Sequence, residues 1–510
     1  MRSSVFGVVA AIACGVRAAV FPVSPEEGGA GIVRAVTAAN AAGGGEVRLA
    51  SGIYRLGTTL AFTATNVTLR AAEKGGAVLS GARPVTGWQA VAGKPWLCAR
   101  LERMGYFRSL IVNGQYAPRA EFPGGGAQLQ NTNVWKVRWL SSETADSLTV
   151  EVPGLVNLLT FKGCENVTFE GIVFENALPP MERSTFSGVG ISAAVTGRQV
   201  TDCAFKACTF RNCGGIALRL SAGRRLRLEG NTFDQSGSCA LQADGRDLFV
   251  SGNRMLASGR VFTSAYACNI SGQGIRFCAN EIDGAPYCGV VFNGEDNLFA
   301  SNVVRNVMQA LKDGAAFYGM GQKTVFRGNR VFDNQPDGKG RHAFYFDEGG
   351  RDGLIVDNSV EGGFRSPVHN HFTYNIVVSN NVFKTPGKQG VSFEGSRWGT
   401  CVNNRFECGE GFERTPNVCE VTNWSGNVFL AGWRASTGRG RGRMPSRIRM
   451  AQRYSSWPAP STGLTGRRTR PRSGRPRRSR STATAPGFAA ASRMAGRDRT
   501  STGRRTARIG

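Results

Sequence analysis

The sequence predicts an all-β chain wound into a parallel solenoid, and three observations support this prediction. Asparagine recurs nine times, at spacings of 22, 27, 22, 27, 29, 23, 23 and 23 residues. Short apolar runs lie on both sides of these positions, and glycine, asparagine and aspartate separate the runs. A period of this length indicates units that bury their apolar faces by stacking on one another. The recurring residues are Asn231, Asn253, Asn280, Asn302, Asn329, Asn358, Asn381, Asn404 and Asn427.

Each unit has its own strands, because its apolar runs are too short for helices. One run precedes the asparagine, as in Leu354-Ile355-Val356, and a second follows it, as in Gly390-Val391-Ser392-Phe393. Such runs between Gly, Asn and Asp are strand and turn signals. We expect each asparagine to lie at an equivalent turn, where it tolerates a left-handed backbone and can form an amide ladder with the next coil. The apolar residue that follows should point inward.

The N-terminal residues predict export and a cap. Arg2, an apolar stretch over residues 5–16, and the small pair Ala18-Ala19 are typical of a secretory signal, with lipoprotein processing at Cys14 as the alternative. We therefore expect a secreted or periplasmic bacterial protein, or an outer-surface lipoprotein, without a membrane span. Residues 28–43 predict a short helix that caps the apolar end of the solenoid.

Most of the formal charge of +27 lies in the C-terminal tail. Residues 434–510 contain 21 arginines and one acid, a net charge of +20, whereas residues 1–433 carry only +7. The tail loses the strand pattern, so we expect it to be disordered. It is either a basic arm for an anionic polymer or membrane surface, or the product of a reading-frame error. In neither case does it predict a nucleic-acid-binding protein.

Cysteine usage favours buried thiols over disulfides in most of the solenoid. Cysteines at or beside apolar strand positions are expected to be small buried hydrophobes, as at Cys203, Cys208 and Cys268. Cys401, Cys408 and Cys419 are the expected disulfide formers. The chain has no CxxC pair and no His/Cys cluster of metal-binding spacing, so zinc is not predicted.

Three N-terminal segments resemble the entry region of secreted right-handed parallel β-helix carbohydrate-active proteins of the pectate-lyase-like superfamily. They are GGGEVRLASGIYRL (43–56), AVLSGARPVTGW (77–88) and FRSLIVNGQYAPRAEFP (107–123). The resemblance is greatest to glycoside hydrolase family 141, in which a small β-domain interrupts the first coil. The resemblance covers roughly residues 40–430 and implies right-handed coils and the inserted β-domain. Together with the composition of the two ends, it predicts five parts: signal peptide 1–19, cap and first coil 20–84, inserted β-domain 85–153, parallel β-helix 154–433 and tail 434–510.

The second strands of successive units align to form a column of polar residues. Successive side chains of a strand point to opposite faces, and neighbouring coils lie about 4.8 Å apart, so these side chains should share one outer face. Such a face forms a groove suited to a sugar chain. An outer face of any solenoid is polar, but here carboxylates and histidines are concentrated within four units. The column contains Asn269, Ser271, Asn293, Tyr345, Asp347, His369, His371, Ser392 and Glu394.

Glycoside hydrolysis needs two carboxyl groups, one protonated to assist the leaving oxygen and one ionised as nucleophile or base. Asp313 and Asp347 are the candidate catalytic pair, and each lies beside an Ala-Phe-Tyr segment. Their positions relative to these segments differ, so the loop at Asp313 must fold over for the two to meet. Glu348 would point away on an ideal strand but could swing out at a turn. The expected substrate-binding residues are Asp296, Tyr318, Tyr345, Glu348, His369, His371 and Glu394.

The family resemblance points to the same residues. Asp313-Gly314-Ala315-Ala316-Phe317-Tyr318 is similar to the family's Asp-Gly-Gly-Ala-Ile-Tyr, and 344–349 (FYFDEG) to its Ile-Tyr-Leu-Asp-Asp-Gly. Asn297 replaces a histidine of the family pattern, and His369-Asn370-His371 lies where the family tends to have Gly-Gly-Arg. These departures suggest a different sugar or a member that has lost activity.

The sequence therefore predicts a glycoside hydrolase that acts on a pectic or hemicellulosic glycan as a monomer, with no cofactor and no metal. A polysaccharide lyase is the alternative, with His371, Lys312 or Lys323 as base and calcium held by Asp296 and Glu348. A third interpretation is a non-catalytic solenoid that binds glycans at a surface. That protein would show the same repeat but would not need carboxylates clustered beside tyrosines.

Overall fold

A computed structural model describes residues 19–90, 92–93, 97–101, 109–116, 129–130, 135–139, 149–181, 186–333, 341–385, 390–407 and 420–430. All of them belong to one compact unit, Met1–Gly438. The expected signal peptide (apart from Ala19), the expected tail and Cys408 and Cys419 lie outside the described residues. No helix among the described residues is long and apolar enough to cross a membrane.

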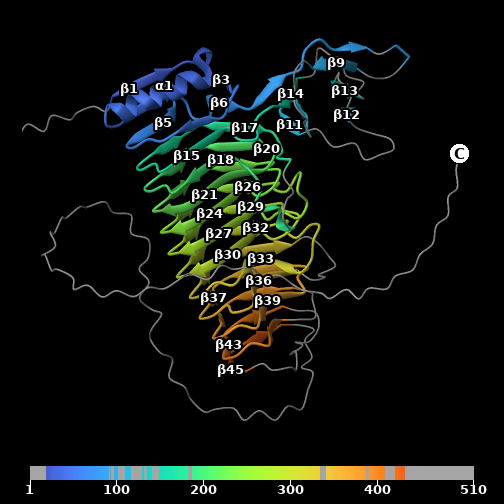
Figure 1. Cartoon of the computed structure of the whole chain (residues 1–510). Helices are drawn as coiled ribbons and strands as arrows, with labels where there is room; N and C mark the ends of the chain where they lie inside the picture. The colour runs from blue at the N-terminus through green and yellow to red at the C-terminus, as the bar shows by residue number, and fades with distance from the viewer. Residues whose placement is uncertain are drawn as a thin grey trace, which may run out of the picture. The chain divides into compact units, whose positions relative to one another are not determined.

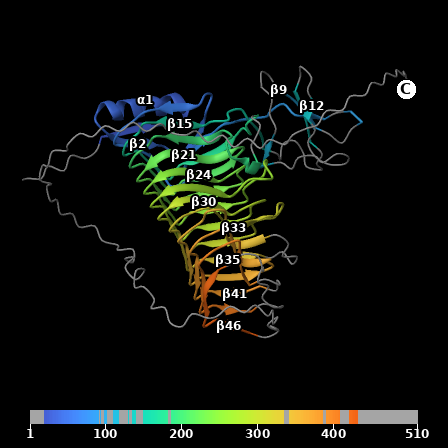
Figure 2. The same ribbon diagram turned by 60° about the horizontal axis from the view of Figure 1, so that its bottom comes forward.

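Three parallel sheets make up the solenoid, with each coil contributing one strand to each sheet in turn (Figures 1 and 2). Sheet A contains β1 (Val20–Val23), β2 (Gly45–Leu49), β5 (Val67–Ala71), β16 (Thr168–Glu170), β19 (Ala204–Lys206), β22 (Arg227–Glu229), β25 (Phe249–Ser251), β28 (Arg276–Cys278), β31 (Leu298–Ala300), β34 (Val325–Arg327), β37 (Leu354–Val356), β40 (Val377–Ser379), β43 (Gly399–Val402) and β45 (Val421–Ser425).

Sheet B follows sheet A within each coil. It contains β3 (Gly52–Arg55), β6 (Ala77–Ser80), β17 (Val173–Ala177), β20 (Thr209–Cys213), β23 (Thr232–Asp234), β26 (Arg254–Leu256), β29 (Glu281–Asp283), β32 (Val303–Arg305), β35 (Arg330–Asp333), β38 (Ser359–Gly362), β41 (Val382–Lys384), β44 (Arg405–Phe406) and β46 (Val428–Phe429).

Sheet C is the third face of the solenoid. It contains β4 (Leu60–Phe62), β15 (Leu159–Lys162), β18 (Ala193–Arg198), β21 (Ile216–Arg224), β24 (Leu241–Arg246), β27 (Cys268–Gln273), β30 (Val290–Glu295), β33 (Gly314–Gly319), β36 (Arg341–Phe346), β39 (Ser366–His371) and β42 (Val391–Glu394). The 3-10 turn η3 (Phe186–Gly188) lies between β17 and β18.

The interior of the solenoid is a stack of like side chains. The middle residue of a three-residue strand points inward, as do Phe205 of β19 and Phe233 of β23. The Phe169 and Phe205 rings stack with centroids 4.6 Å apart, and those of Phe210 and Phe233 4.8 Å apart. Each unit buries its apolar side chains against the units before and after it. One continuous hydrophobic core therefore runs along the axis.

The predicted asparagine ladder is confirmed, but the left-handed backbone expected at these asparagines lies one residue earlier, as at Ser301 with φ 57° and Gly328 with φ 64°. All nine asparagines lie between a strand of sheet A and a strand of sheet B, and each of the first eight donates from Nδ2 to Oδ1 of the next at 2.8–3.1 Å. The residue two positions after each of the first eight asparagines, such as Val304 or Val331, is fully or almost fully buried. The repeat in the sequence is therefore the repeat of the coil.

A helix covers the first coil. The 3-10 turn η1 (Pro25–Glu27) leads into α1 (Gly28–Ala41), which buries Ile32, Val36 and Ala39 against the core. Figure 1 shows α1 at the end of the stack opposite β45. The predicted capping helix thus forms where the apolar interior would otherwise meet water.

Two small antiparallel sheets interrupt the solenoid after its first coils. One contains β7 (Ala82–Pro84), β10 (Ile111–Val112), β11 (Gln115–Tyr116) and β14 (Val150–Pro153). The other contains β8 (Gln89–Ala90), β9 (Leu97–Leu101), β12 (Leu129–Gln130) and β13 (Trp135–Trp139). The chain then returns to sheet C with β15, which pairs with β4 about one hundred residues earlier.

The cysteines of the described coils are free thiols, and all but the half-buried Cys278 are buried. Burial raises the pKa of Cys208 to about 12 and that of Cys203 to about 11, as expected of small hydrophobes inside a core. The expectation of a disulfide at Cys401 is wrong. Its thiol is buried under the asparagine ladder, where Asn404 Nδ2 lies 3.4 Å from the sulfur.

Candidate functional site

Sheet C brings several of the predicted polar residues together. In its register Tyr318 of β33 pairs with Tyr345 of β36, Tyr345 with His369 of β39, and His369 with Ser392 of β42. Two residues further along the strands, His371 pairs with Glu394. Consecutive coils therefore place these side chains in two parallel columns on the outer face of the sheet.

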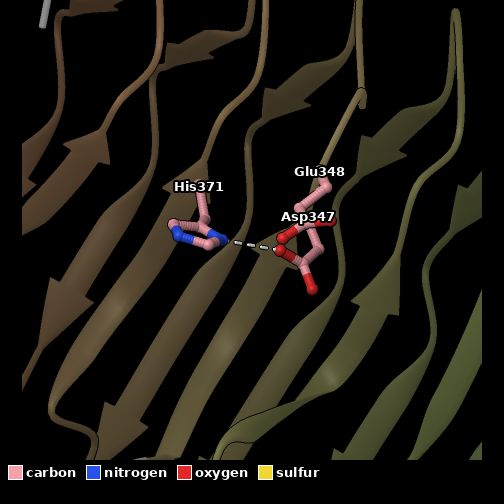
Figure 3. A group of neighbouring side chains, drawn as sticks. All are labelled: Asp347, Glu348 and His371. Carbon is pink, nitrogen blue, oxygen red and sulfur yellow. Dashed lines mark hydrogen bonds and ion pairs between the residues drawn. The ribbon is translucent and has the colours of Figure 1, made fainter. Parts of the chain in front are cut away.

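Asp347 follows the last residue of β36 and is held by both neighbouring coils. Its Oδ2 accepts a hydrogen bond from the Tyr318 hydroxyl at 2.7 Å, and its Oδ1 lies 2.9 Å from Nδ1 of His371 (Figure 3). Tyr318 belongs to the preceding coil and His371 to the following one. With only 9 % of its surface exposed, Asp347 has a fixed position.

The surroundings of Asp347 favour its ionised form. Burial acts to raise its pKa, but the hydrogen bonds from His371 and Tyr318 outweigh burial and hold the pKa below its ordinary value. Burial and the same hydrogen bond to Asp347 raise the pKa of Tyr318 far above its usual range. Near neutral pH, Asp347 is therefore an ionised carboxylate that accepts a hydrogen bond from the protonated hydroxyl of Tyr318.

Glu348 supplies the acid that lies close to Asp347. Atoms of Asp347, Glu348 and His371 lie within 4.8 Å of one another, and Figure 3 shows the two carboxylates side by side. The chain turns here, with the amide of Gly350 bonded to the Asp347 carbonyl at 2.9 Å. The turn ends the alternation of the strand, so adjacent residues can present their carboxylates on one side. The expected swing of Glu348 is therefore observed.

Asp313, the expected catalytic partner, lies in the loop before β33. It precedes β33 with a left-handed φ of 61°, its side chain is exposed, and its carbonyl accepts a hydrogen bond from the Tyr287 hydroxyl at 2.7 Å. It borders a hollow of about 380 Å³. The residues that line this hollow are Lys312, Asp313, His342, Tyr345, Arg365, His369, His371 and Glu394.

All three histidines of the chain stand in one row beside this hollow. The rings of His342 and His369 stack at 4.5 Å with 16° between their planes, and His371 follows at 6.0 Å from His369. Burial, then the nearby His371 and Arg365, lower the pKa of His369 to about 4. His369 is therefore neutral near pH 7, and its Nδ1 is bonded to the Ser392 hydroxyl.

His342 and Arg365 were not anticipated as part of the site. His342 lies on β36, three residues before Tyr345, and a count of histidines could have indicated it because the chain has only three. Burial and His369 lower the pKa of His342 well below its ordinary value. Arg365 lies in the loop before β39, and no periodic pattern predicts the path of that loop.

The remaining predicted residues divide between the hollow and the corner of the coil. Glu394, at the end of β42, lines the hollow with its side chain exposed. Asp296 instead lies in the corner turn between β30 and β31, with φ at 56° and its amide bonded to the Gln322 carbonyl. Lys323, a candidate lyase base, lies in the same corner one coil later with φ at 46°.

The residues do not fit the calcium site considered for a lyase. Asp296 lies in the corner turns, so it is not part of the group formed by Asp347, Glu348 and His371. Both oxygens of Asp347 are hydrogen-bonded, and the third member of the group offers nitrogen, whereas calcium prefers six to eight oxygen ligands.

Comparisons with known proteins agree with this fold. A family model described as the right-handed β-helix region matches residues 266–432. A solved structure titled as a glycoside hydrolase is similar with a TM-score of 0.52 and 14 % identity, covering 81 % of this chain and 96 % of the other. The chain is therefore a right-handed parallel β-helix. A search of curated protein sequences finds no match.

Two further solved structures show lower similarity. A surface adhesin of Streptococcus pneumoniae has a TM-score of 0.48 and 12 % identity, with 81 % of this chain and 98 % of the adhesin covered. An exopolygalacturonase of Thermotoga maritima has a TM-score of 0.43 and 11 % identity, with 74 % and 90 % covered.

Proposed function

We propose that the chain is a glycoside hydrolase that cleaves a pectic or hemicellulosic glycan at the outer face of sheet C. The observation that carries the proposal is Asp347, a carboxylate held ionised by Tyr318 and His371 with a second carboxylate, Glu348, within 4.8 Å. The cationic transition state of glycoside hydrolysis needs a fixed anion beside the sugar and a second acid to protonate the leaving oxygen. We also propose that the signal at residues 1–19 directs export of the protein.

Asp347 is assigned the role of the ionised carboxylate, because its hydrogen bonds stabilise charge. Glu348 is exposed and can exchange protons with water, so it is assigned the role of acid and base. One oxygen of each carboxylate lies within 4.8 Å of the other, which agrees better with the roughly 5 Å of retaining enzymes than with the roughly 6.5–9.5 Å of inverting ones. Asp313 borders the hollow that His371 also lines, and it is the second candidate for the proton donor.

The hollow offers hydrogen-bonding groups to a sugar ring. Tyr345, His369 and the exposed Glu394 line it. His369 is neutral, so its ring has one donor and one acceptor nitrogen for hydrogen bonds with sugar hydroxyl groups. We assign these three residues, with His371, to substrate binding.

The decisive experiment is a screen of pectic and hemicellulosic oligosaccharides, with product masses measured for the intact protein and for Asp347→Asn. We expect saturated products and a loss of about 10³-fold or more in turnover for the variant. Asp357→Asn is the matched control, because it removes an exposed carboxylate of the same coil at a turn that tolerates asparagine. Cleavage by Asp347→Asn near the original rate would place the chemistry elsewhere.

The stereochemistry of the first product separates the two candidate acids. Retention of the anomeric configuration, followed by NMR, is expected for the Asp347–Glu348 pair. In that case Glu348→Gln should lose most of the activity, whereas Asp313→Asn should keep it. Inversion would exclude this pair and favour Asp313.

A polysaccharide lyase remains the second candidate, because two cations and a neutral histidine line the hollow. Lys312 and Arg365 could neutralise the carboxylate of an acidic sugar, and His369 could accept the proton that elimination removes. Unsaturated products that absorb in the ultraviolet would favour this reaction over hydrolysis.

A further inference from the structure

Three exposed aromatic side chains lie at one corner of the solenoid beside the candidate site. Phe372, Tyr374 and Trp398, here called the aromatic corner, have 52 %, 42 % and 52 % of their surface exposed. The Tyr374 and Trp398 rings lie 6.1 Å apart. Large apolar side chains that face water together mark a surface for binding.

The backbone at this corner makes the aromatic residues unusual. In the turn from sheet C to sheet A, the residue two positions before the first of the paired residues Leu298, Val325, Leu354, Val377 and Thr400 has a left-handed φ. The other coils mostly use residues that tolerate it, such as Asp296, Asp352 and Asn375. Trp398 occupies the equivalent position with φ at 58°. A bulky aromatic side chain gives this turn no advantage over asparagine, so the structure of the coil does not account for the choice of tryptophan.

Phe372 also has a left-handed φ, and its ring packs against a glycine of the neighbouring coil. Its φ is 49°, and the neighbouring coil presents Gly395, where an added Cβ would lie 2.5 Å from Cε1 of Phe372. The ring therefore lies flat against a glycine rather than in the core. An observed departure from favourable backbone geometry points to a functional requirement.

A hollow of about 560 Å³ combines these rings with hydrogen-bonding groups. Gly349, Arg351, Asp352, Tyr374, Asn375 and Trp398 line it. Asn375 Nδ2 donates to Asp352 Oδ1 at 2.7 Å, which fixes this carboxylate beside the rings. Aromatic faces beside fixed polar groups match a sugar ring, which has a flat C–H face and hydroxyl groups around its edge.

This hollow lies beside the candidate active site. Gly349 follows Glu348 in the chain, and the ring of Phe372 lies 4.4 Å from that of His371. A glycan whose scissile bond lies at Asp347 would therefore carry its next sugar units towards the aromatic corner.

We propose that the aromatic corner is a binding subsite for sugar units of the glycan that the protein acts on, with Trp398 and Tyr374 stacking on the rings and Asp352 and Arg351 bonding hydroxyl groups. The choice of a glycan as ligand rests on the proposed function, but binding here does not require cleavage. A second copy of the chain is the competing occupant of such a surface.

The test is affinity electrophoresis of the full-length protein in gels that contain xylan, pectin or polygalacturonate. Wild type should be retarded in at least one gel, and Trp398→Asn and Tyr374→Ala should bind about tenfold more weakly, as expected from the loss of a stacked ring. Asparagine is favoured at this turn, so Trp398→Asn should melt at or above the wild-type temperature. Ile53→Asn, an exposed apolar residue on β3, is the control and should bind as wild type does.

Each other outcome overturns the proposal. Equal retention of wild type and Trp398→Asn, or no retention of wild type in any gel, would show that the corner does not bind these glycans. A sedimentation coefficient that rises with wild-type concentration, but not for Trp398→Asn, would assign the corner to a second copy. Asp347→Asn separates the two proposals, because it should bind fully, and wild type that binds without cleaving would overturn only the hydrolase.

Discussion

At the scale of single residues, the site is defined by the hydrogen bonds of Asp347. Its two oxygens are bonded by side chains of the preceding and following coils, Tyr318 and His371. A carboxylate that was merely exposed would be free to rotate and would titrate at its ordinary pKa. The bonds therefore fix both the orientation and the charge of Asp347.

Tyr318→Phe tests this electrostatic role. Because the Tyr318 hydroxyl helps to lower the pKa of Asp347, its removal should raise that pKa, and the acid limb of the pH–activity profile should move to higher pH. Activity near neutral pH should fall by roughly tenfold to a hundredfold, with little change in KM. Tyr54→Phe, which removes a hydroxyl in the N-terminal cap, should leave the profile in place. An unchanged acid limb in Tyr318→Phe would contradict this role.

His369 should make stability depend on pH. Its folded pKa is about 4 against 6.5 for the free group, so between these values the unfolded state binds more protons than the folded state. The free energy of unfolding should therefore be unaffected above pH 6.5 and fall by about 3 kcal/mol as pH decreases to 4, with His342 acting in the same direction. Urea denaturation across this range measures it, and His369→Asn should flatten the slope.

The sequence predicted which residues lie on this face better than it predicted which of them are close to one another. Tyr345, His369 and Glu394 were placed on one face because strand alternation is regular. The closeness of Glu348 to Asp347 depends on a turn after β36, and Arg365 and Asp313 lie on loops, so periodicity could not place any of them. The pairing of Asp313 with Asp347 was based on the similar segments beside them and on the family resemblance, and it stays a prediction.

At the scale of elements, the asparagine ladder joins the coils between sheets A and B. Asn329 Oδ1 accepts from the backbone and side-chain amides of Asn302, and its Nδ2 donates to Asn358 and to the Phe299 carbonyl. The repeat was visible in the sequence because every coil needs this amide. The longer spacings of 27 and 29 arise where the loop from sheet B to sheet C is longer, as before β27, β33 and β36.

Asn329→Ala should destabilise the fold by about 3–5 kcal/mol, because it leaves buried donors and acceptors of two coils without partners. Asn403→Gly is the matched control. Asn403 is exposed at a left-handed turn that glycine also adopts, so the effect should stay within about 0.5 kcal/mol. Chemical denaturation of both variants gives the comparison, and equal stabilities would show that the ladder is dispensable.

At the scale of the whole molecule, a helix closes one end of the stack. The first coil is covered by α1, whose Ile32 and Val36 are fully buried against the core. An uncovered coil would present unpaired strand edges and apolar rings to other molecules. The sequence predicted this cap from an alanine-rich segment before the first strands of the solenoid, and the structure confirms it.

Ile32→Asp should open this end of the solenoid. The buried charge should destabilise the cap by about 3–5 kcal/mol, and the exposed coil should associate with others end to end. Light scattering should then show oligomers whose size rises with protein concentration. Ala38→Asp introduces the same charge on the exposed side of the same helix, and this variant should remain monomeric. Monomeric Ile32→Asp at high concentration would contradict the capping role.

The buried free thiols can report local unfolding of the solenoid. They recur along the axis from Cys164 to Cys401, and burial raises their pKa, which suppresses reaction with alkylating reagents while the coils stay closed. A coil that opens transiently exposes its thiol and is labelled permanently. Pulsed alkylation followed by peptide mass spectrometry would therefore rank the coils by the frequency of local unfolding, without any engineered probe.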